Sequence, residues 1–457
     1  MMPSARISRR AADRIRAGHL WVYRSDIESI QTGEAPDALL TLLDPRGAPL
    51  GSALYSSASE IALRLVSREP DLTRAQYLAD LRARIEAALH LRATSLAPEA
   101  FATEESTNAC RLIFSEADSL PGIVADRYAG LVILQLLTQG TAQDDVRRIL
   151  AEIFSAQPWC QTIVERPDPR IRELEHLPPE PAAPLFTRTG SAQPQMPSSR
   201  AEACSVEVEG PPHLSFAHNE TLATVFSLNG LRFHYDATAG QKTGAFLDQR
   251  LNYLAAARLA ERAGIAHGRG GARGRALDIC TYQGGFALHL ARVCTHVTGV
   301  DASRAALEVA DRNAALNPGL PSKIDWIEAD AFELMRDFSD RAASDPTARY
   351  DTIVLDPPAF AKSKRAAEGA LRGYKELNLR ALKMLSAPTA GKYASLITCS
   401  CSHHVSLADF TEVVRSAAAD AGRRVQMLEV RGAAPDHPAI LTLPETSYLK
   451  CLLLRVE

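Results

Sequence analysis

The sequence predicts an α/β protein in which two smaller units precede a larger doubly wound domain. From about residue 214, short apolar strands alternate with helical stretches, a pattern typical of a parallel sheet with helices on both faces. Residues 1–70 are rich instead in short strands and turns. The chain has 457 residues, more than one ordinary domain holds, so several cores are expected.

Residues 1–70 are predicted to form a compact β-rich unit. Apolar runs flank Asp-Pro-Arg-Gly at 44–47, which indicates a hairpin turn. The first 24 residues carry six arginines against one acid, Asp13, so this unit could hold nucleic-acid phosphates. A solvated helix face explains these arginines equally well. They are Arg6, Arg9, Arg10, Arg14, Arg16 and Arg24.

Residues 71–177 are predicted to form a small α+β unit. Leu78, Leu81, Ile85 and Leu89 recur at helical spacing within 73–93, and a second helix is expected from about 142 to 154. The stretch between these helices contains strand-like runs separated by Pro-Gly and Ala-Gly turns. Residues 178–212 are rich in Pro, Ser and Ala without periodicity, which is typical of a linker or a hairpin insertion.

Residues 213–457 are predicted to form the doubly wound domain. Its helices are expected in "GFALHLARV", "RAALEVADRNAAL", "DAFELMRDFSDRA" and "YKELNLRALKML". Its five strands are expected in "RALDIC", "THVTGVDAS", "SKIDWIEAD", "YDTIVLDPP" and "KYASLITCS". Such sheets bind ligands at the carboxyl ends of their strands, near the switch in strand order.

The composition, with 46% hydrophobic and 23% charged residues, is that of an ordinary soluble protein. The net charge of -3 means that any nucleic-acid-binding surface must be local. We find no run near the ~20 apolar residues of a membrane helix, and no signal peptide. We therefore expect a cytoplasmic protein that uses no membrane and keeps its eight cysteines reduced.

The ends of the first three predicted strands are expected to bind a cofactor. Gly284 and Gly285 would let the backbone approach a ligand, and the helix start after them offers N–H groups to a carboxylate. Asp301 ends the second strand and suits ribose hydroxyls, and Asp330 ends the third and suits an exocyclic amine. Each acid alone is also typical of a helix N-cap. Their order favours a nucleoside with a carboxylate, such as S-adenosylmethionine, over NAD, which usually comes with the full glycine pattern.

The fourth strand ends in "DPPAF", which suits a planar heterocycle bearing an amine. Pro357 and Pro358 rigidify the turn, so that Asp356 can bond the ring edge while Phe360 supports its face. A basic stretch follows this turn and suggests a polyanionic substrate. Its basic residues are Lys362, Lys364, Arg365, Arg372 and Lys375.

The fifth strand ends in "ITCSCSHH", which raises four interpretations. The spacing is too cramped for a four-ligand zinc site, and a Cys-x-Cys disulfide would be strained. Buried packing explains Cys399, which lies within the strand. Cys401 falls where the strand runs out into the pocket, and a thiolate there could attack an electrophilic ring carbon. His403 and His404 are given no role.

With these motifs in place, the chain resembles the PUA-domain-bearing family of bacterial large-subunit ribosomal RNA cytosine-5 methyltransferases. The resemblance covers nearly the whole length. It is carried by "GHLWVY", "SEADSLPGIVADRY", "QKTGAFLDQR", "YQGGFAL", "VDAS", "DPPAF", "RGYKELN", "SCS", "DHP" and "PETSYLK". The chain departs from the family in its longer 177–212 segment, in "YQGGF" for "YTGGF", and in having a cysteine at Cys399.

The resemblance implies a PUA-like domain at 1–70, a central α+β domain at 71–177 and a Rossmann-like class I methyltransferase domain at 213–457. It also implies S-adenosyl-L-methionine as cofactor, a cytosine in ribosomal RNA as acceptor and Cys401 as nucleophile. We expect Asp356 to be the catalytic partner of Cys401, and we expect no metal. Substrate contacts are expected from Pro357, Pro358, Phe360, Lys362, Arg372 and Lys375. Cofactor contacts are expected from Phe246, Asp248, Gln249, Arg250, Tyr282, Gln283, Gly284, Gly285, Asp301, Ala302, Asp330 and Ala331.

Two other functions remain open at this point. Asp-Pro-Pro-aromatic motifs also resemble those of enzymes that methylate an amino group of a base or a protein, chemistry that needs no thiol. A non-catalytic RNA-binding factor in ribosome assembly is a third hypothesis, against which Asp301, Asp356 and Cys401 argue. The sequence also leaves open the modified nucleotide, free RNA versus an assembling subunit as substrate, the base that removes the C5 proton, and monomer versus homodimer.

Overall fold

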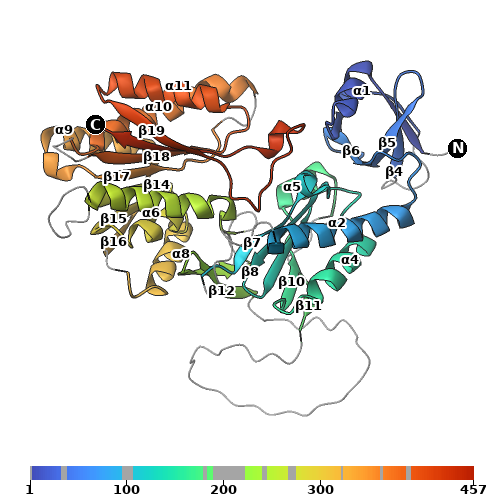
Figure 1. Cartoon of the computed structure of the whole chain (residues 1–457), viewed down its shortest axis with the longest axis horizontal. Coiled ribbons are helices and arrows are strands. Elements are labelled where there is room, and N and C mark those ends of the chain that lie inside the picture. Colours follow the sequence, from blue (N-terminus) through green and yellow to red (C-terminus); the bar gives the residue numbers. More distant parts are fainter. Residues whose placement is uncertain are drawn as a thin grey trace, which may run out of the picture.

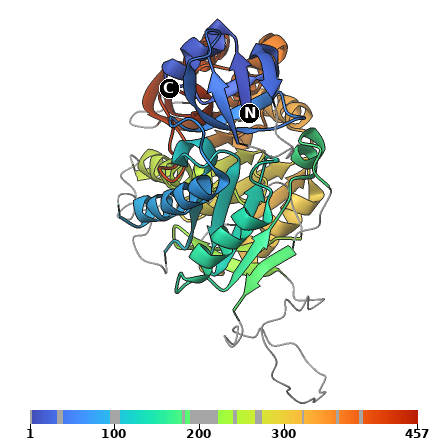
Figure 2. The ribbon, with the colours of Figure 1, turned by 90° about the vertical axis from the view of Figure 1, so that its right-hand side faces the viewer.

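The computed structural model describes residues 3–31, 39–94, 106–178, 183–188, 222–238, 244–265, 274–320, 323–360, 364–387 and 393–457. Figure 1 shows an N-terminal β unit, a central α+β unit and a larger C-terminal α/β unit. In Figure 2 the N-terminal unit lies above the central unit, and the C-terminal unit lies behind both. The predicted α/β class is therefore confirmed.

The N-terminal unit is a six-stranded sheet in the order β2-β6-β5-β4-β1-β3. The predicted turn at 44–47 joins β4 to β5, and the Asp44 carboxylate closes it by accepting from the Arg46 and Ala48 amides at 2.9 Å each. The elements are β1 (Ser4–Ile7), α1 (Arg9–Arg16), β2 (Trp21–Tyr23), η1 (Arg24–Asp26), β3 (Ile27–Gln31), β4 (Leu39–Leu43), β5 (Pro49–Tyr55) and β6 (Ile61–Ser67).

The central unit is a five-stranded sheet in the order β11-β10-β9-β8-β7, with both predicted helices present. Its last strand, β11 (Ala183–Thr187), lies inside the segment expected to be a linker or a hairpin insertion. It pairs antiparallel with β10, so the sheet extends beyond residue 177. Most of 178–212 lies outside the described residues. The other elements are α2 (Arg74–Thr94), β7 (Ala109–Phe114), η2 (Ser115–Asp118), β8 (Ile123–Tyr128), β9 (Leu131–Leu136), α4 (Asp144–Ser155), β10 (Thr162–Glu165) and α5 (Pro169–Leu174).

The C-terminal unit is a seven-stranded sheet in the order β16-β15-β14-β17-β18-β20-β19. The five predicted strands are present and parallel: β14 (Arg275–Ile279), β15 (His296–Asp301), β16 (Lys323–Glu328), β17 (Thr352–Leu355) and β18 (Ala394–Ser400). The sequence did not predict β19 (Val425–Arg431) or β20 (Lys450–Val456), which pair antiparallel and make the sheet mixed. Strand order switches between β14 and β17, which places the ligand-binding edge there.

Helices cover both faces of this sheet, and the strand pair β12–β13 joins it to the central unit (Figure 1). The elements are β12 (Ala223–Leu228), β13 (Leu231–Asp236), η3 (Leu247–Gln249), α6 (Arg250–Ile265), α7 (Gly285–Leu290), α8 (Arg304–Ala315), α9 (Ala331–Ser344), η4 (Pro346–Ala348), η5 (Lys364–Ala366), α10 (Ala367–Met384), α11 (Leu407–Asp420) and η6 (Pro444–Thr446).

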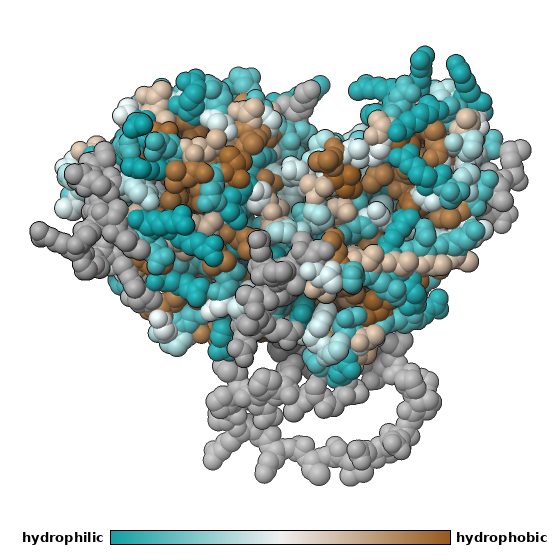
Figure 3. Space-filling view, in the orientation of Figure 1, coloured by the Kyte–Doolittle hydropathy of each residue, from teal (hydrophilic) through white to brown (hydrophobic). Residues whose placement is uncertain are grey.

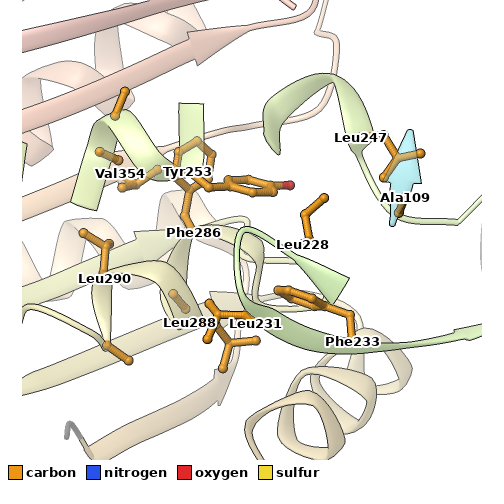
Figure 4. Close-up of a cluster of buried hydrophobic side chains, with 14 of the residues drawn as sticks. Ala109, Leu228, Leu231, Phe233, Leu247, Tyr253, Phe286, Leu288, Leu290 and Val354 are labelled. Atoms are coloured by element: carbon orange, nitrogen blue, oxygen red, sulfur yellow. The ribbon is translucent and has the colours of Figure 1, made fainter. Parts of the chain in front are cut away.

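A buried cluster between α6, α7 and the β12–β13 pair supports one face of the sheet (Figure 4). The rings of Tyr253 and Phe286 pack edge to face with centroids 4.7 Å apart. A Cβ at Gly285 would lie 2.5 Å from the Tyr253 ring, so glycine is needed there for helix packing. Helix packing therefore explains the glycine at position 285 without any ligand.

Buried charges join the central unit to the C-terminal unit. Asp436 pairs with the fully buried Arg250 and accepts from the Arg111 amide at 2.8 Å, while its own carbonyl accepts from Arg92 at 2.9 Å. Burial opposes ionisation of Asp436, but His437 and Arg250 hold its pKa well below its usual range. The pair therefore stabilises the fold at neutral pH, and its contribution is lost as pH falls below about 4.

We expect Asp436→Ala to lower the free energy of unfolding at pH 7 by roughly 3–5 kcal/mol, because Arg250 would keep a buried charge without its carboxylate. Chemical denaturation measures this change. Glu412→Ala is the matched control, because Glu412 pairs with Arg415 on the surface of α11, where solvent screens the pair and its loss should leave the free energy of unfolding nearly unchanged. Equal destabilisation of the two variants would contradict a stabilising role of the buried pair.

Candidate active site

The turn after β14 has an unusual backbone. Cys280, Tyr282 and Gly284 all have positive φ, at 62°, 51° and 84°. A left-handed residue other than glycine costs roughly 1–2 kcal/mol, and such conformations concentrate at functional sites. The turn brings its backbone close to the switch point of the sheet. This is where we expected a ligand from the glycine-containing motif.

Two acids hold this turn. The Asp301 carboxylate, at the end of β15, accepts from the Tyr282 amide and the Ser303 amide, each at 2.9 Å. The buried carboxylate of Asp278 accepts from Thr281 at 2.6 Å and from the Ala287 amide at 2.9 Å. Burial raises the pKa of Asp278 to about 7. Asp278 was not predicted from the sequence, although it is the only acid within the first strand, "RALDIC".

The remaining residues predicted to bind cofactor at these strand ends differ in role. Asp330 is exposed and caps α9, accepting from the Phe332 and Glu333 amides at 2.9 and 3.1 Å, which is the simpler interpretation of this acid. Gln283 is half-buried, and its carbonyl accepts from Asn313 at 3.0 Å. Ala302 is exposed and Ala331 half-buried beside the two acids.

The segment around η3 approaches the same edge. The Phe246 ring is 39% exposed and lies 5.0 Å from the Tyr282 ring. The Asp248 carboxylate accepts from the Tyr448 hydroxyl, and the buried Gln249 amide donates to Asp356 at 2.9 Å. Two aromatic rings, a left-handed backbone turn and the Asp301 carboxylate thus lie together at one edge of the sheet.

Arg250 corrects one prediction. Its side chain is 0% exposed and pairs with Asp436 in the interface described above. A guanidinium that is fully enclosed by protein has no surface to offer a ligand. Arg250 therefore anchors the start of α6 and holds η3 in place, and it does not contact a cofactor.

Asp356 lies half-buried just after β17. Burial, reinforced by the charges of Asp248 and Asp278, raises its pKa to about 8, against the hydrogen bond from Gln249. A carboxyl group with this pKa is mostly protonated at neutral pH. It can therefore donate a proton to a ring nitrogen, which an ordinary aspartate cannot do.

The two cysteines of "ITCSC" occupy different depths. Cys399 is 0% exposed within β18, directly opposite Cys451 of β20. Burial raises the pKa of Cys399 well above its usual value. Cys401 is half-buried just past the strand end, where its sulfur donates to the Pro357 carbonyl at 3.9 Å. This contact brings Cys401 against the turn that carries Asp356.

Two residues without a predicted role contact the serines that flank Cys401. The Tyr374 hydroxyl of α10 bonds Ser400 at 3.0 Å and Ser402 at 2.9 Å, on either side of the cysteine. Lys450 donates to the Ser402 carbonyl at 2.6 Å. Tyr374 lies in "RGYKELN" and Lys450 in "PETSYLK", so the motifs were visible, but nothing in them indicated proximity to Cys401.

A shallow groove beside this site has an aromatic wall. The Phe360 ring lies 5.8 Å from Phe332 and 4.9 Å from Tyr374. The groove, with a volume of about 470 Å³, is lined by Phe332, Phe360, Arg365, Ala366, Glu368, Gly369, Ala370, Arg372 and Gly373. Its size and aromatic wall suit a planar base.

The other residues predicted to bind substrate are less uniform. Pro357 is buried and Pro358 exposed. Arg372 lines the groove but pairs with Glu368 at 2.7 Å, and Lys375 pairs with Asp420 of α11 at 2.7 Å. Lys362 lies outside the described residues.

The predicted basic patch of the N-terminal unit is reduced by ion pairs. Arg14 pairs with Asp26 and Arg16 with Asp44, each at 2.5 Å. The side chain of Arg9 is 91% exposed and reaches Asp13 only at 4.0 Å. In Figure 3, hydrophilic side chains project from the top of this unit, where Figure 1 places α1. The exposed arginines that keep a charge accessible for phosphates are Arg6, Arg9 and Arg10.

Two absences hold within the described ranges. They contain no helix both long and apolar enough to cross a membrane. They also contain no group of three His, Cys, Asp or Glu residues arranged to hold a metal ion.

Comparison with known families matches two parts of the chain. Residues 5–68 match the model of a PUA-like domain, and residues 276–355 match that of a methyltransferase domain. A methyltransferase solved in complex with SAH superposes with a TM-score of 0.72 at 17% identity, over 100% of both chains. A SAM-dependent methyltransferase from Streptococcus mutans gives 0.71 at 16% identity, also over 100% of both chains. At these identities the likeness shows the fold.

Two curated relatives match almost the full length. A protein of Deinococcus radiodurans named ribosomal RNA large subunit methyltransferase is 34% identical over 456 residues, which cover 99% of this chain and 97% of the relative. An Escherichia coli protein named ribosomal RNA large subunit methyltransferase I is 31% identical over 439 residues, which cover 96% of this chain and 95% of the relative.

Proposed function

Because the chain belongs to the family of large-subunit ribosomal RNA methyltransferases, we propose that it methylates carbon 5 of a cytosine in that RNA through a covalent bond from Cys401 to carbon 6. S-adenosyl-L-methionine is the cofactor and supplies the methyl group. We place the reaction in the cytoplasm, where the ribosomal subunit assembles.

The observation that carries this proposal is the contact between two strand ends. The Cys401 sulfur lies 3.9 Å from the Pro357 carbonyl, next to Asp356. A thiol and a carboxyl group that holds its proton thus meet at the cofactor edge of the sheet. Carbon 5 of cytosine is a weak nucleophile. The thiol can activate it by bonding to carbon 6, and the protonated carboxyl group can stabilise the charge that then develops on the ring.

The reaction needs the following steps from these residues. The Cys401 sulfur forms a bond to carbon 6, which pushes electron density onto carbon 5 and ring nitrogen N3. Asp356 bonds the N3/N4 edge and gives its proton to N3 as that charge develops. After carbon 5 takes the methyl group, it loses its proton to water, the bond from Cys401 to carbon 6 breaks, and Asp356 recovers the N3 proton.

The substrate must also be held. A base inside a duplex cannot reach a pocket at a strand edge, so the target cytosine has to be unstacked. We propose that the ring wall of Phe332 and Phe360 receives it. We further propose that the exposed arginines of the PUA-like unit and those lining the groove bind the surrounding phosphates.

Identification of the methylated nucleoside tests the proposal. Ribosomal RNA from a strain lacking the gene is incubated with the protein and cofactor, digested to nucleosides and analysed by mass spectrometry. We expect 5-methylcytidine from the wild type and none from Cys401→Ala. Methylation on N4 of cytosine, retained in Cys401→Ala, would instead support the amino-group chemistry that the Asp-Pro-Pro-aromatic motif also suits.

Asp301→Ala is expected to weaken cofactor binding by roughly 1.5–3 kcal/mol for each charge-assisted hydrogen bond that the substitution removes. Asp301 also accepts a hydrogen bond from the Tyr282 amide, so its loss could disturb the turn as well as the ligand contact. Asp301→Asn keeps an acceptor for the Tyr282 amide but loses the charge. Comparing the two variants therefore separates contact with the ligand from support of the turn. Calorimetry measures both variants. Wild-type affinity in a folded Asp301→Ala protein would remove this residue from the site.

Replacing Arg9 and Arg10 with Gln is expected to weaken RNA binding and leave cofactor binding unchanged. For each phosphate that the variant no longer neutralises, the slope of log affinity against log salt should become shallower by roughly 0.7. Arg304→Gln on α8 is the control, because Arg304 is 69% exposed in another unit. If the double variant follows the wild-type salt dependence, α1 does not bind RNA.

A further inference from the structure

Lys450 is a buried cation that, among the residues described by the structure, pairs with no carboxylate. It begins β20, is 8% exposed, and lies opposite Ser400 in the strand pairing. Its ammonium donates to the Ser402 carbonyl at 2.6 Å. Within the described part of the chain, the lysines paired with a carboxylate within 4.0 Å are Lys323 and Lys375. Burying an ammonium group without a counter-charge is energetically costly. We therefore expect an anion close to Lys450.

Cys401 is the group that can supply this anion. Ser400 and Ser402, the two residues that Lys450 adjoins, flank Cys401 directly. Burial lowers the pKa of Lys450 to about 8, and the Cys401 charge acts in the opposite direction. At neutral pH Lys450 is therefore mostly protonated, and its charge favours the thiolate of its neighbour.

Four other titratable groups around Cys401 are neutral at neutral pH. Burial raises the pKa of Tyr374 on α10 and of Tyr448 before β20, so both remain phenols. Burial raises the pKa of Asp356 to about 8, and burial lowers the pKa of His403, which favours the neutral imidazole. These groups offer Cys401 no formal positive charge.

The more distant charged groups near Tyr448 already have partners of their own. Arg111 makes two bonds to Asp126, both at 2.8 Å. Asp248 accepts from the Tyr448 hydroxyl. Lys450 is a cation whose charge interacts directly with that of Cys401.

We propose that the Lys450 ammonium is the counter-ion that holds Cys401 as a reactive thiolate, which makes Lys450 a positioning residue for the nucleophile. This inference rests on the proposed function of Cys401. The thiol proton leaves to solvent water, and the sulfur keeps the electron pair that later forms the bond to carbon 6. The bond from Lys450 to the Ser402 carbonyl fixes the loop so that the charge stays beside the sulfur.

Alkylation of Cys401 at different pH values tests the inference without RNA or cofactor. Full-length protein reacts with iodoacetamide between pH 5 and 10, and mass spectrometry of the Cys401 peptide gives its rate alone. Lys450→Met should move the midpoint up by about one pH unit and slow the reaction at pH 7 roughly tenfold, with the same plateau at high pH. Lys450→Arg should restore most of the rate. Lys323→Met, at the opposite end of the sheet, should match the wild type.

The wild type itself provides a test if Lys450→Met does not fold. Its Cys401 midpoint should lie below the roughly 8.5 of a free cysteine, and a midpoint at or above that value overturns the inference. An unchanged midpoint in folded Lys450→Met overturns it as well, as does a lower plateau shared by the Met and Arg variants. A nucleophile role could still fail with the shifted midpoint intact, because only the RNA experiments report on that role.

Discussion

Cys401→Ala should lower the methylation rate at least roughly 10³-fold, which corresponds to about 4 kcal/mol in the activation barrier. Without the sulfur, carbon 5 is not activated and the other groups of the site have little to act on. Single-turnover methylation of ribosomal RNA with saturating cofactor measures the effect. Calorimetry should show unchanged cofactor affinity, because the sulfur lies against the Pro357 carbonyl after β17 and the cofactor is expected at the turn after β14.

Cys399→Ala is the matched control. Cys399 is fully buried opposite Cys451, so its replacement should cost about 1 kcal/mol of stability and change the methylation rate only a few-fold. If Cys399→Ala is inactive while Cys401→Ala retains activity, the assignment of the nucleophile is reversed.

Asp356→Asn should lower the methylation rate roughly 10²- to 10⁴-fold, the range typical of removing a general acid. Asparagine can still bond the base edge, but it cannot give a proton to N3. The wild-type rate should fall as pH rises through about 8, because the raised pKa of Asp356 means that its proton is lost there. Asp356→Asn should lack this alkaline limb.

Rates of both proteins between pH 6 and 10, with RNA and cofactor saturating, test this account. Gln249→Leu provides a second variant, because it removes the hydrogen bond that Asp356 accepts at 2.9 Å. This hydrogen bond lowers the pKa of Asp356, so its loss should move the alkaline limb to higher pH. An alkaline limb that persists unchanged in Asp356→Asn would assign the titration to another group.

The sequence allowed much of the fold and the candidate site to be predicted. The five parallel strands were visible because each is a short apolar run between helical patterns. The sequence also predicted that Asp301, Asp356 and Cys401 lie at one edge, because parallel strands bring their carboxyl ends together there. Depth along the strand also separated Cys399 from Cys401, and the structure places Cys399 inside the sheet and Cys401 past its end.

What the sequence could not indicate depends on contacts between distant segments. Arg250 looked like a ligand contact because its partner, Asp436, lies far along the chain. Lys450 could not be placed without the antiparallel strand β20, which brings it opposite Ser400. The basic N-terminus looked stronger than it is because Arg14 and Arg16 meet acids from other elements. Side-chain pairing of this kind leaves no periodic pattern in the sequence.

The covalent bond between Cys401 and the base can be tested directly with RNA that carries 5-fluorocytosine at the target position. Fluorine at carbon 5 cannot leave as a proton does, so the adduct formed after methyl transfer persists. With cofactor present, wild type and Cys399→Ala should each give a protein–RNA band that resists denaturation, and Cys401→Ala should give none. Peptide mass spectrometry should locate the RNA on Cys401. Absence of the band from wild-type protein that methylates unmodified RNA would contradict catalysis by a thiol.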